Sequence, residues 1–272
     1  MKFLRSLFWE IVAAGLLTVA PSLSQAQQRA VHVLIITGAS DEPYHHWRET
    51  TEVVRNALQR TGRFRVDASE KPQTLTSGIL QHYDVVVLNY NGPRWPRQAE
   101  DAVELFVRSG KGLAAFHQNC YGTFFGMEFR DKRWQAGPPG SGWIAYPQMI
   151  GSNWAPENIG HAQRGEFAVE WEDRAHPISR GLPAFFTAYD ELYHRITLLP
   201  GTRVLASAMS PVETGGTGNR EPVVWVKEYG KGRVFFTTLG HDVQAWRRPG
   251  AINALVRGVE WAATDKVTVN LQ

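Results

Sequence analysis

Gly110-Lys111-Gly112-Leu113-Ala114-Ala115-Phe116-His117 leads from a glycine turn through an apolar run to a histidine. The same order of features returns in Gly230-Lys231-Gly232-Arg233-Val234-Phe235-Phe236-Thr237-Thr238-Leu239-Gly240-His241. Short apolar runs that follow a glycine turn are typical of buried strands in an α/β sheet. Ligands of open α/β sheets bind beyond the carboxyl ends of the strands. We therefore expect His117 and His241 to lie at the edge of the sheet where a site forms.

The rest of the chain alternates apolar runs with amphipathic stretches. This alternation predicts an α/β fold with a doubly wound, mostly parallel sheet and helices on both faces. The order along the chain gives a strand at 31–37, a helix at 47–60, strands at 63–68 and 83–90, a helix from Pro96 to about 109, and the strand that ends at His117. Further strands are expected at 165–171, 203–208, 222–227 and 232–239, and a last helix at 251–263. Between Tyr121 and about Gly165, residues rich in Gly, Pro, Trp and Asn predict a long irregular loop held over the site.

The first 26 of the 272 residues resemble a secretory signal peptide, with Lys2 and Arg5 before an apolar stretch from Ile11 to Ala20. We expect residues 27–272 to form a single α/β domain that is secreted or periplasmic and, after cleavage, not bound to a membrane. A net charge of +3, without any basic run, gives no reason to expect nucleic-acid binding. The single cysteine, Cys120, excludes an intrachain disulfide.

Histidines gather near the predicted strand ends. His45 follows the first strand, His117 and His241 each end a strand, and His161 lies in the long loop. Taken singly, each is explained as well by a surface or capping role. Together they favour a site, in which they act as acids and bases or as ligands of a divalent metal such as zinc, with His117, His161 and His241 as the metal candidates. The sequence does not choose between these roles, because no zinc-motif spacing is present.

Carboxylates and aromatic residues complete the candidate site. Asp190 and Glu191 precede Tyr193, and on a strand only one of the two carboxylates would face the site. Asp242 could supply a further oxygen. Ten tryptophans, several of them in expected loops, suit a carbohydrate, whose ring faces pack on indole while its hydroxyls bind polar groups. The alternative for these tryptophans is that they fill gaps between loops and core.

Cys120 lies three residues after the predicted strand end, so His117 occupies the turn where related α/β enzymes carry a nucleophile. A histidine in that position would act as acid, base or ligand, and a small buried thiol is the better interpretation of Cys120. A cysteine-dependent amidase therefore stands behind the histidine-based site as a hypothesis.

The chain resembles the trehalose-utilisation (ThuA-like) family over about residues 31–263. The matching motifs, in order, are the Gly-Lys-Gly strand that ends at His117, Gly160-His161, Ala175-His176-Pro177-Ile178, Asp190-Glu191-Leu192-Tyr193, Pro222-Val223-Val224-Trp225 and the second Gly-Lys-Gly strand with Leu239-Gly240-His241-Asp242. The resemblance implies a class I glutamine amidotransferase-like (flavodoxin-like) fold without the cysteine nucleophile. It also implies a part in disaccharide breakdown, including sugars oxidised at the 3-position. The Trp- and Pro-rich loop from Trp134 to Trp154 departs from the family and puts trehalose itself in doubt as the substrate.

These observations lead to one leading hypothesis, an enzyme acting on a glycoside or 3-keto-sugar as a hydrolase, lyase or isomerase. His117, His241, His161 and Glu191 are its candidate catalytic residues. The candidate sugar-binding residues are Asn119, Trp154, Tyr193, Asp190, Asp242 and His45. The alternative is a non-catalytic sugar-binding protein on the same fold. The expected partner is a small carbohydrate, and the sequence leaves open whether the chain forms a homo-oligomer.

Overall fold

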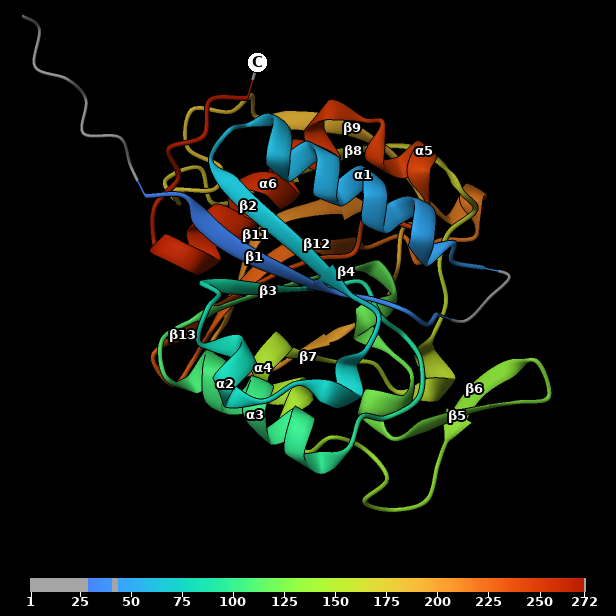
Figure 1. Ribbon diagram of the computed structural model, residues 1–272. Helices are drawn as coiled ribbons and strands as arrows, with labels where there is room; N and C mark the ends of the chain where they lie inside the picture. Colours follow the sequence, from blue (N-terminus) through green and yellow to red (C-terminus); the bar gives the residue numbers. More distant parts are fainter. Residues whose placement is uncertain (1–28, 41–43, 272) are drawn as a thin grey trace, which may run out of the picture.

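The computed structural model describes residues 29–40 and 44–271. A nine-stranded sheet forms its centre (Figure 1). The strands lie in the order β2-β1-β3-β4-β13-β12-β11-β8-β9. Their bounds are β1 Val31–Ile36, β2 Phe64–Ser69, β3 Val85–Leu88, β4 Gly112–Phe116, β8 Gly165–Trp171, β9 Phe185–Asp190, β11 Thr202–Met209, β12 Arg220–Tyr229 and β13 Gly232–Thr237. The predicted α/β class is therefore confirmed, and both Gly-Lys-Gly runs are strands.

The sheet is mixed, which corrects the expectation of a mostly parallel one. Strands β2, β1, β3, β4 and β13 run parallel to one another. From β13 onward, the pairs β13–β12, β12–β11, β11–β8 and β8–β9 are all antiparallel. The chain reaches β13 from β12 through the tight turn at Gly230 and Lys231, and so short a connection can join only antiparallel strands.

Helices cover both faces of the sheet, as predicted (Figure 1). One face packs against α1 (Trp47–Arg60), α5 (Val243–Trp246) and α6 (Pro249–Thr264); the other packs against α2 (Ser77–Leu80), α3 (Arg97–Arg108) and α4 (Tyr146–Ile150). Successive side chains of a strand point to opposite faces. In β1, accordingly, Ile35 belongs to the first of these cores and Ile36 to the second. The inner parallel strands β3 and β4 are apolar throughout because both of their faces are buried, whereas the edge strand β2 exposes Arg65 and Asp67.

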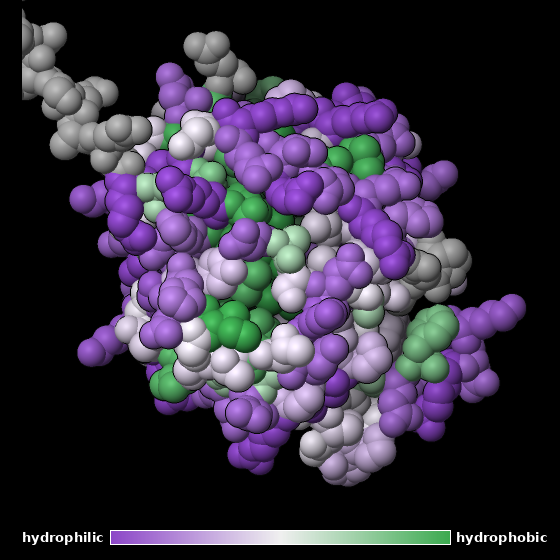
Figure 2. Space-filling model, in the orientation of Figure 1, coloured by the Kyte–Doolittle hydropathy of each residue, from purple (hydrophilic) through white to green (hydrophobic). Residues whose placement is uncertain are grey.

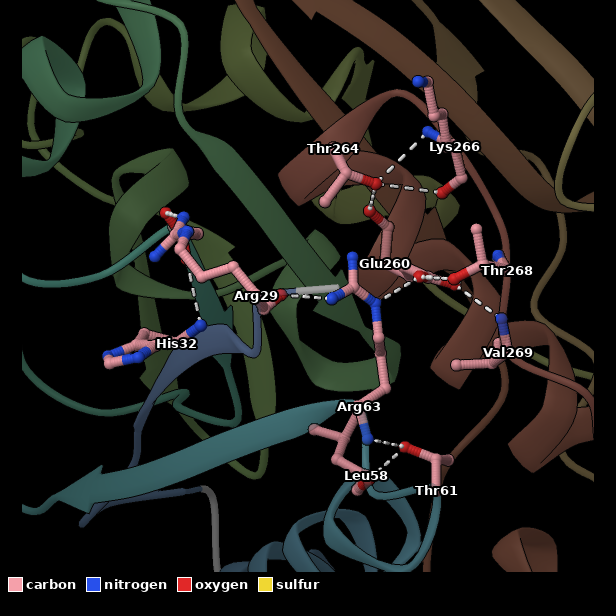
Figure 3. A network of polar contacts seen from close by, with 11 residues as sticks. Arg29, His32, Leu58, Thr61, Arg63, Glu260, Thr264, Lys266, Thr268 and Val269 are labelled. Atoms are coloured by element: carbon pink, nitrogen blue, oxygen red, sulfur yellow. Dashed lines mark hydrogen bonds and ion pairs between the residues drawn. The ribbon is translucent and has the colours of Figure 1, made fainter. Parts of the chain in front are cut away.

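A buried carboxylate joins the start of β2 to the C-terminal end of the chain (Figure 3). The side chain of Glu260 in α6 is fully enclosed and accepts a hydrogen bond from Nε of Arg63 at 2.7 Å. It also accepts from the backbone N–H groups of Thr268 and Val269 and from the Thr268 hydroxyl. These hydrogen bonds outweigh burial, which by itself raises the pKa of Glu260, and lower that pKa below its ordinary value.

The segment predicted to be irregular contains regular structure, so that prediction is wrong in part. Strands β5 (Met127–Arg130) and β6 (Arg133–Ala136) form a hairpin that projects from the body (Figure 1). Its two-residue turn places Asp131 and Lys132 at φ of 51° and 61°, as the tight hairpin turn requires. The segment continues through α4 to the short β7 (Ser152–Asn153), which pairs with β10 (Thr197–Leu198). The 3₁₀ turns are η1 Pro72–Thr74, η2 His117–Cys120, η3 Thr123–Phe125, η4 Pro156–Asn158 and η5 Val212–Thr214.

The signal-peptide prediction for residues 1–26 lies outside the described residues. Within them, every helix is too short or too polar to cross a membrane. Figure 2 shows one face of the molecule, where hydrophilic side chains predominate and hydrophobic ones are visible in small groups.

Candidate active site

The two strand-end histidines meet because β4 and β13 are adjacent parallel strands, with Phe116 paired to Thr237. His117 is the first residue after β4 and has a φ of 44°, which is unusual for a residue with a side chain. Such strained positions cluster at functional sites, and this one resembles the sharp strand-to-helix turn on which α/β enzymes mount a reactive group. The turn directs the His117 ring toward Thr238 and His241 in the loop that follows β13.

His117 lies at the centre of a buried polar group. Its Nδ1 lies 2.8 Å from the carbonyl oxygen of Thr238, and a carbonyl can only accept. Nδ1 therefore carries the proton, and Nε2 presents a lone pair. That lone pair accepts a hydrogen bond from the Tyr193 hydroxyl at 2.7 Å, and Nδ1 of His241 lies 3.2 Å away. The His45 ring completes the group, with its centroid 4.9 Å from that of His117 and 5.0 Å from that of His241.

The environment keeps two of these rings uncharged near neutral pH. Burial, together with His45 and His241, holds the pKa of His117 well below its ordinary value. Burial lowers the pKa of His241 to about 4, with His45 and Arg164 acting in the same direction. A neutral imidazole can accept a proton or donate a lone pair to a metal, so these rings suit a base or a ligand.

A carboxylate links this buried group to a histidine closer to solvent. Oε2 of Glu191 lies 3.3 Å from Nδ1 of His241 and 3.8 Å from Nε2 of His161. The His161 side chain is 46% exposed, against 17% for Glu191 and 13% for His241. The backbone of His161 bridges to that of Tyr193, which holds both residues in place. Glu191 thus lies beside both histidines, closer to His241 than to His161.

All of these residues except the fully buried His117 line a cleft of about 470 Å³. Its volume is in the range of sites for small ligands. Aromatic residues form much of its wall, and polar ones reach into it: the lining includes Tyr44, His45, Tyr121, Phe129, Lys132, Arg133, Trp134, Trp154, Glu157, His161, Glu191, Tyr193 and His241. The β5–β6 hairpin supplies Trp134 on one side, with its ring 5.6 Å from that of Tyr121. An aromatic wall with a polar floor fits the amphipathic surface of a sugar.

Three of the predicted sugar-binding residues, Asn119, Asp242 and Asp190, lie outside this lining. The Asn119 side chain is buried and donates to the carbonyl oxygens of Leu88 and Phe116. Asp242 caps α5 by accepting from the N–H of Ala245, and it pairs with Arg164. Both side chains are engaged in holding the loops behind the site.

Asp190 also lies behind the site. Its side chain is buried, and it accepts from the backbone N–H of Gly240 at 2.6 Å and from that of Glu191 at 2.8 Å. Burial raises the pKa of Asp190 to about 7, although these hydrogen bonds act against the shift. Gly240 has a φ of 120°, and a Cβ there would lie 2.3 Å from the Trp246 ring, so only glycine fits beside His241.

Cys120 is fully buried and donates to the carbonyl oxygen of His117. Burial raises the pKa of its thiol well above the ordinary value, which disfavours the thiolate that a nucleophile requires. The sequence did not single out Tyr121 or Arg133 as contact residues. The aromatic side chain of Tyr121, so close after a strand end, was the available signal for it.

The fold and the cleft define an α/β protein with a histidine-rich site at the carboxyl ends of its parallel strands. The family model described as ThuA, trehalose utilisation, matches residues 32–262, so the chain belongs to the ThuA family and the resemblance seen in the sequence is confirmed. No curated protein sequence matches the chain.

Solved structures agree with this assignment. A putative ThuA-like protein from Parabacteroides merdae has a TM-score of 0.73 and 28% identity, over 88% of this chain and 92% of the other. A second putative ThuA-like protein, from Bacteroides uniformis, has a TM-score of 0.65 and 18% identity, over 87% and 94%. The fold also resembles part of a β-galactosidase from Bacillus circulans sp. alkalophilus, with a TM-score of 0.56 and 14% identity, over 86% of this chain and 31% of that enzyme.

Proposed function

We propose that this ThuA-family protein is an enzyme of carbohydrate catabolism that acts on a glycoside or a 3-keto-sugar. The sugar ring would lie between Trp134, Trp154 and Tyr121, which line the cleft. Glu191 and His161 would exchange protons with the sugar at the mouth of the site. The buried polar group around His117 would bind the reacting oxygen of the sugar. The apolar stretch near the N-terminus supports a secreted or periplasmic location for this activity.

One observation carries the proposal: Glu191 lies within 4 Å of two histidines at the floor of a cleft whose walls are aromatic. General acid–base catalysis requires groups that give and take protons beside a bound substrate. A carbonyl at the 3-position of a sugar acidifies the neighbouring C–H bonds. A carboxylate and uncharged histidines can accept such protons.

Turnover of a panel of ordinary and 3-keto glycosides tests the proposal. The wild-type chain should convert at least one member, and His161→Ala should reduce kcat/KM by about 100-fold or more, since an acid–base group contributes roughly 10²–10⁴-fold. The matched control is His82→Ala, because His82 is exposed and precedes β3 at the opposite end of the sheet. This control should retain wild-type turnover. Tight sugar binding without any product would contradict the proposal and favour a sugar-binding protein.

A further inference from the structure

We propose that His45, His117 and His241 form a binding site for one divalent transition metal of the zinc class. This inference deepens the proposed function, on which it rests for its role, because the metal would lie at the floor of the same cleft. One nitrogen from each ring belongs to a set of ligand atoms that all lie within 4.8 Å of one another.

The spacing of the nitrogens fits a small metal ion. Nε2 of His117 and Nδ1 of His241 are 3.2 Å apart. Two nitrogens bound to tetrahedral zinc at about 2.0–2.1 Å would lie about 3.4 Å from each other. The third nitrogen, from His45, lies within 4.8 Å of the other two, so it would have to move closer by at most about 1.4 Å to reach that spacing.

The three rings are steeply inclined to one another and do not stack. The interplanar angles are 72° for His45 with His117, 72° for His45 with His241 and 75° for His117 with His241. Stacked rings would direct their nitrogen lone pairs in parallel, whereas rings inclined in this way can direct them to one point. The three residues come from loops after β1, β4 and β13, so separate parts of the sheet fix each ring.

The hydrogen bonds behind the rings are those expected of metal ligands. The Thr238 carbonyl accepts the Nδ1–H of His117, and the lone pair of Nε2 therefore faces His241 and Tyr193. Histidines that bind metals usually donate their other N–H to a carbonyl or carboxylate in this way. The loop that carries His241 is held in turn by the hydrogen bond from the Gly240 N–H to Asp190.

The donor set also indicates which metals the site would select. Three imidazoles suit zinc, copper, nickel or iron, whereas magnesium and calcium prefer oxygen ligands. A metal would take the lone pair of His117 that now accepts from Tyr193, so the Tyr193 hydroxyl and the Glu191 carboxylate would remain beside it. Three histidines with a further position open to a cleft is the ligand count of catalytic zinc sites. When bound, such an ion would polarise a sugar oxygen or lower the pKa of a water molecule.

Zinc titration of the purified, chelator-treated chain tests the inference by calorimetry, with Co²⁺ absorption as a second readout. The wild-type chain should bind one equivalent. His45→Ala and His241→Ala should each weaken binding by at least about 100-fold, above the 10–100-fold typical of losing only a residue that supports a ligand. The matched controls are His46→Ala, an exposed neighbour of His45, and His161→Ala, and both should keep wild-type affinity. Thermal melts without metal show whether each variant folds. If one of the two ligand variants fails to fold, the other still tests the site.

The results of this titration and of the sugar assays test the metal site and the proposed function separately. Failure of the wild-type chain to bind zinc or cobalt, or unchanged binding in a folded His45→Ala variant, would overturn the metal site. Sugar turnover by the metal-free chain would then leave the proposed function standing. One-equivalent binding that is lost in both ligand variants, but without turnover of any sugar, would support the metal site and count against the proposed function.

Discussion

Replacement of Asp190 by asparagine tests whether the buried carboxylate behind the site positions His241. Each carboxylate oxygen of Asp190 accepts one backbone N–H, that of Gly240 at 2.6 Å and that of Glu191 at 2.8 Å. Asparagine has one acceptor oxygen, so its NH₂ group would face the other N–H donor. The change in side-chain volume is negligible, and the perturbation is therefore confined to these two hydrogen bonds.

The expected magnitude follows from the loss of one such bond. When the pH lies well above the Asp190 pKa of about 7, the carboxylate is charged. A hydrogen bond to a charged group contributes about 1.5–3 kcal/mol, and a buried donor left without an acceptor costs about as much. We expect Asp190→Asn to lower the free energy of unfolding by about 2 kcal/mol. For a domain of this size, that corresponds to a fall in Tm of roughly 4–8 °C.

The assay combines thermal melting with steady-state kinetics on the best sugar substrate. Because Asp190 lies outside the lining of the cleft, kcat should fall while KM stays near the wild-type value. The matched control is Asp101→Asn, whose carboxylate is 59% exposed and pairs loosely with Arg97, so both its Tm and its kinetics should stay at wild-type values. An Asp190→Asn variant with unchanged kcat and a Tm within 1 °C of wild type would refute the reasoning.

Three further predictions concern the cleft wall, a structural carboxylate and the thiol. Trp134→Ala should raise KM for the sugar by about 3–10-fold, because an aromatic contact contributes about 0.5–1.5 kcal/mol. Its Tm should change little, because the hairpin projects from the body. Equal KM values for the variant and the wild type would show that the sugar does not contact Trp134. Glu260 has a pKa below its ordinary value of 4.5 in the folded chain, so its contribution to stability is present above that value and is lost as the pH falls through the folded pKa. The difference in unfolding free energy between the wild type and Glu260→Gln, measured by urea denaturation, should therefore shrink between pH 7 and pH 3, and a constant difference would contradict it. Cys120→Ser should keep most of the activity, and the native thiol should resist alkylation because it is buried; a loss of turnover with an intact fold would favour the cysteine-dependent hypothesis.

The strands could be predicted because burial on both faces leaves a clear mark in the sequence. The runs at Val31–Ile36 and Gly232–Thr237 are mainly apolar, with His32 and Arg233 near their starts, and have the predicted places. Strand β9 was missed, because Phe185–Asp190 lies at the edge of the sheet and its residues alternate between exposed and partly buried or buried positions. The antiparallel direction of the later strands depends on which strands pair, and an apolar run looks the same in either direction.

The place of His117 and His241 at one edge of the sheet followed from strand ends, whereas their contact depends on the adjacency of β4 and β13, which the apolar runs do not reveal. The place of His45 beside them depends on the path of its loop, and so does the more exposed place of His161 next to Glu191. Side-chain direction explains the remaining differences. Adjacent residues point apart, so Glu191 faces the cleft while Asp190 turns into the core, as the alternation of a strand implies.

The central claim is that Glu191 moves protons to or from a sugar bound in the cleft. The most direct test is kcat/KM for the best glycoside or 3-keto glycoside, measured for the wild type and for Glu191→Gln, which keeps the shape of the side chain but cannot take up a proton. We expect turnover by the wild type and a fall of about 100-fold or more in the variant. Equal kcat/KM values for the two folded proteins would contradict it.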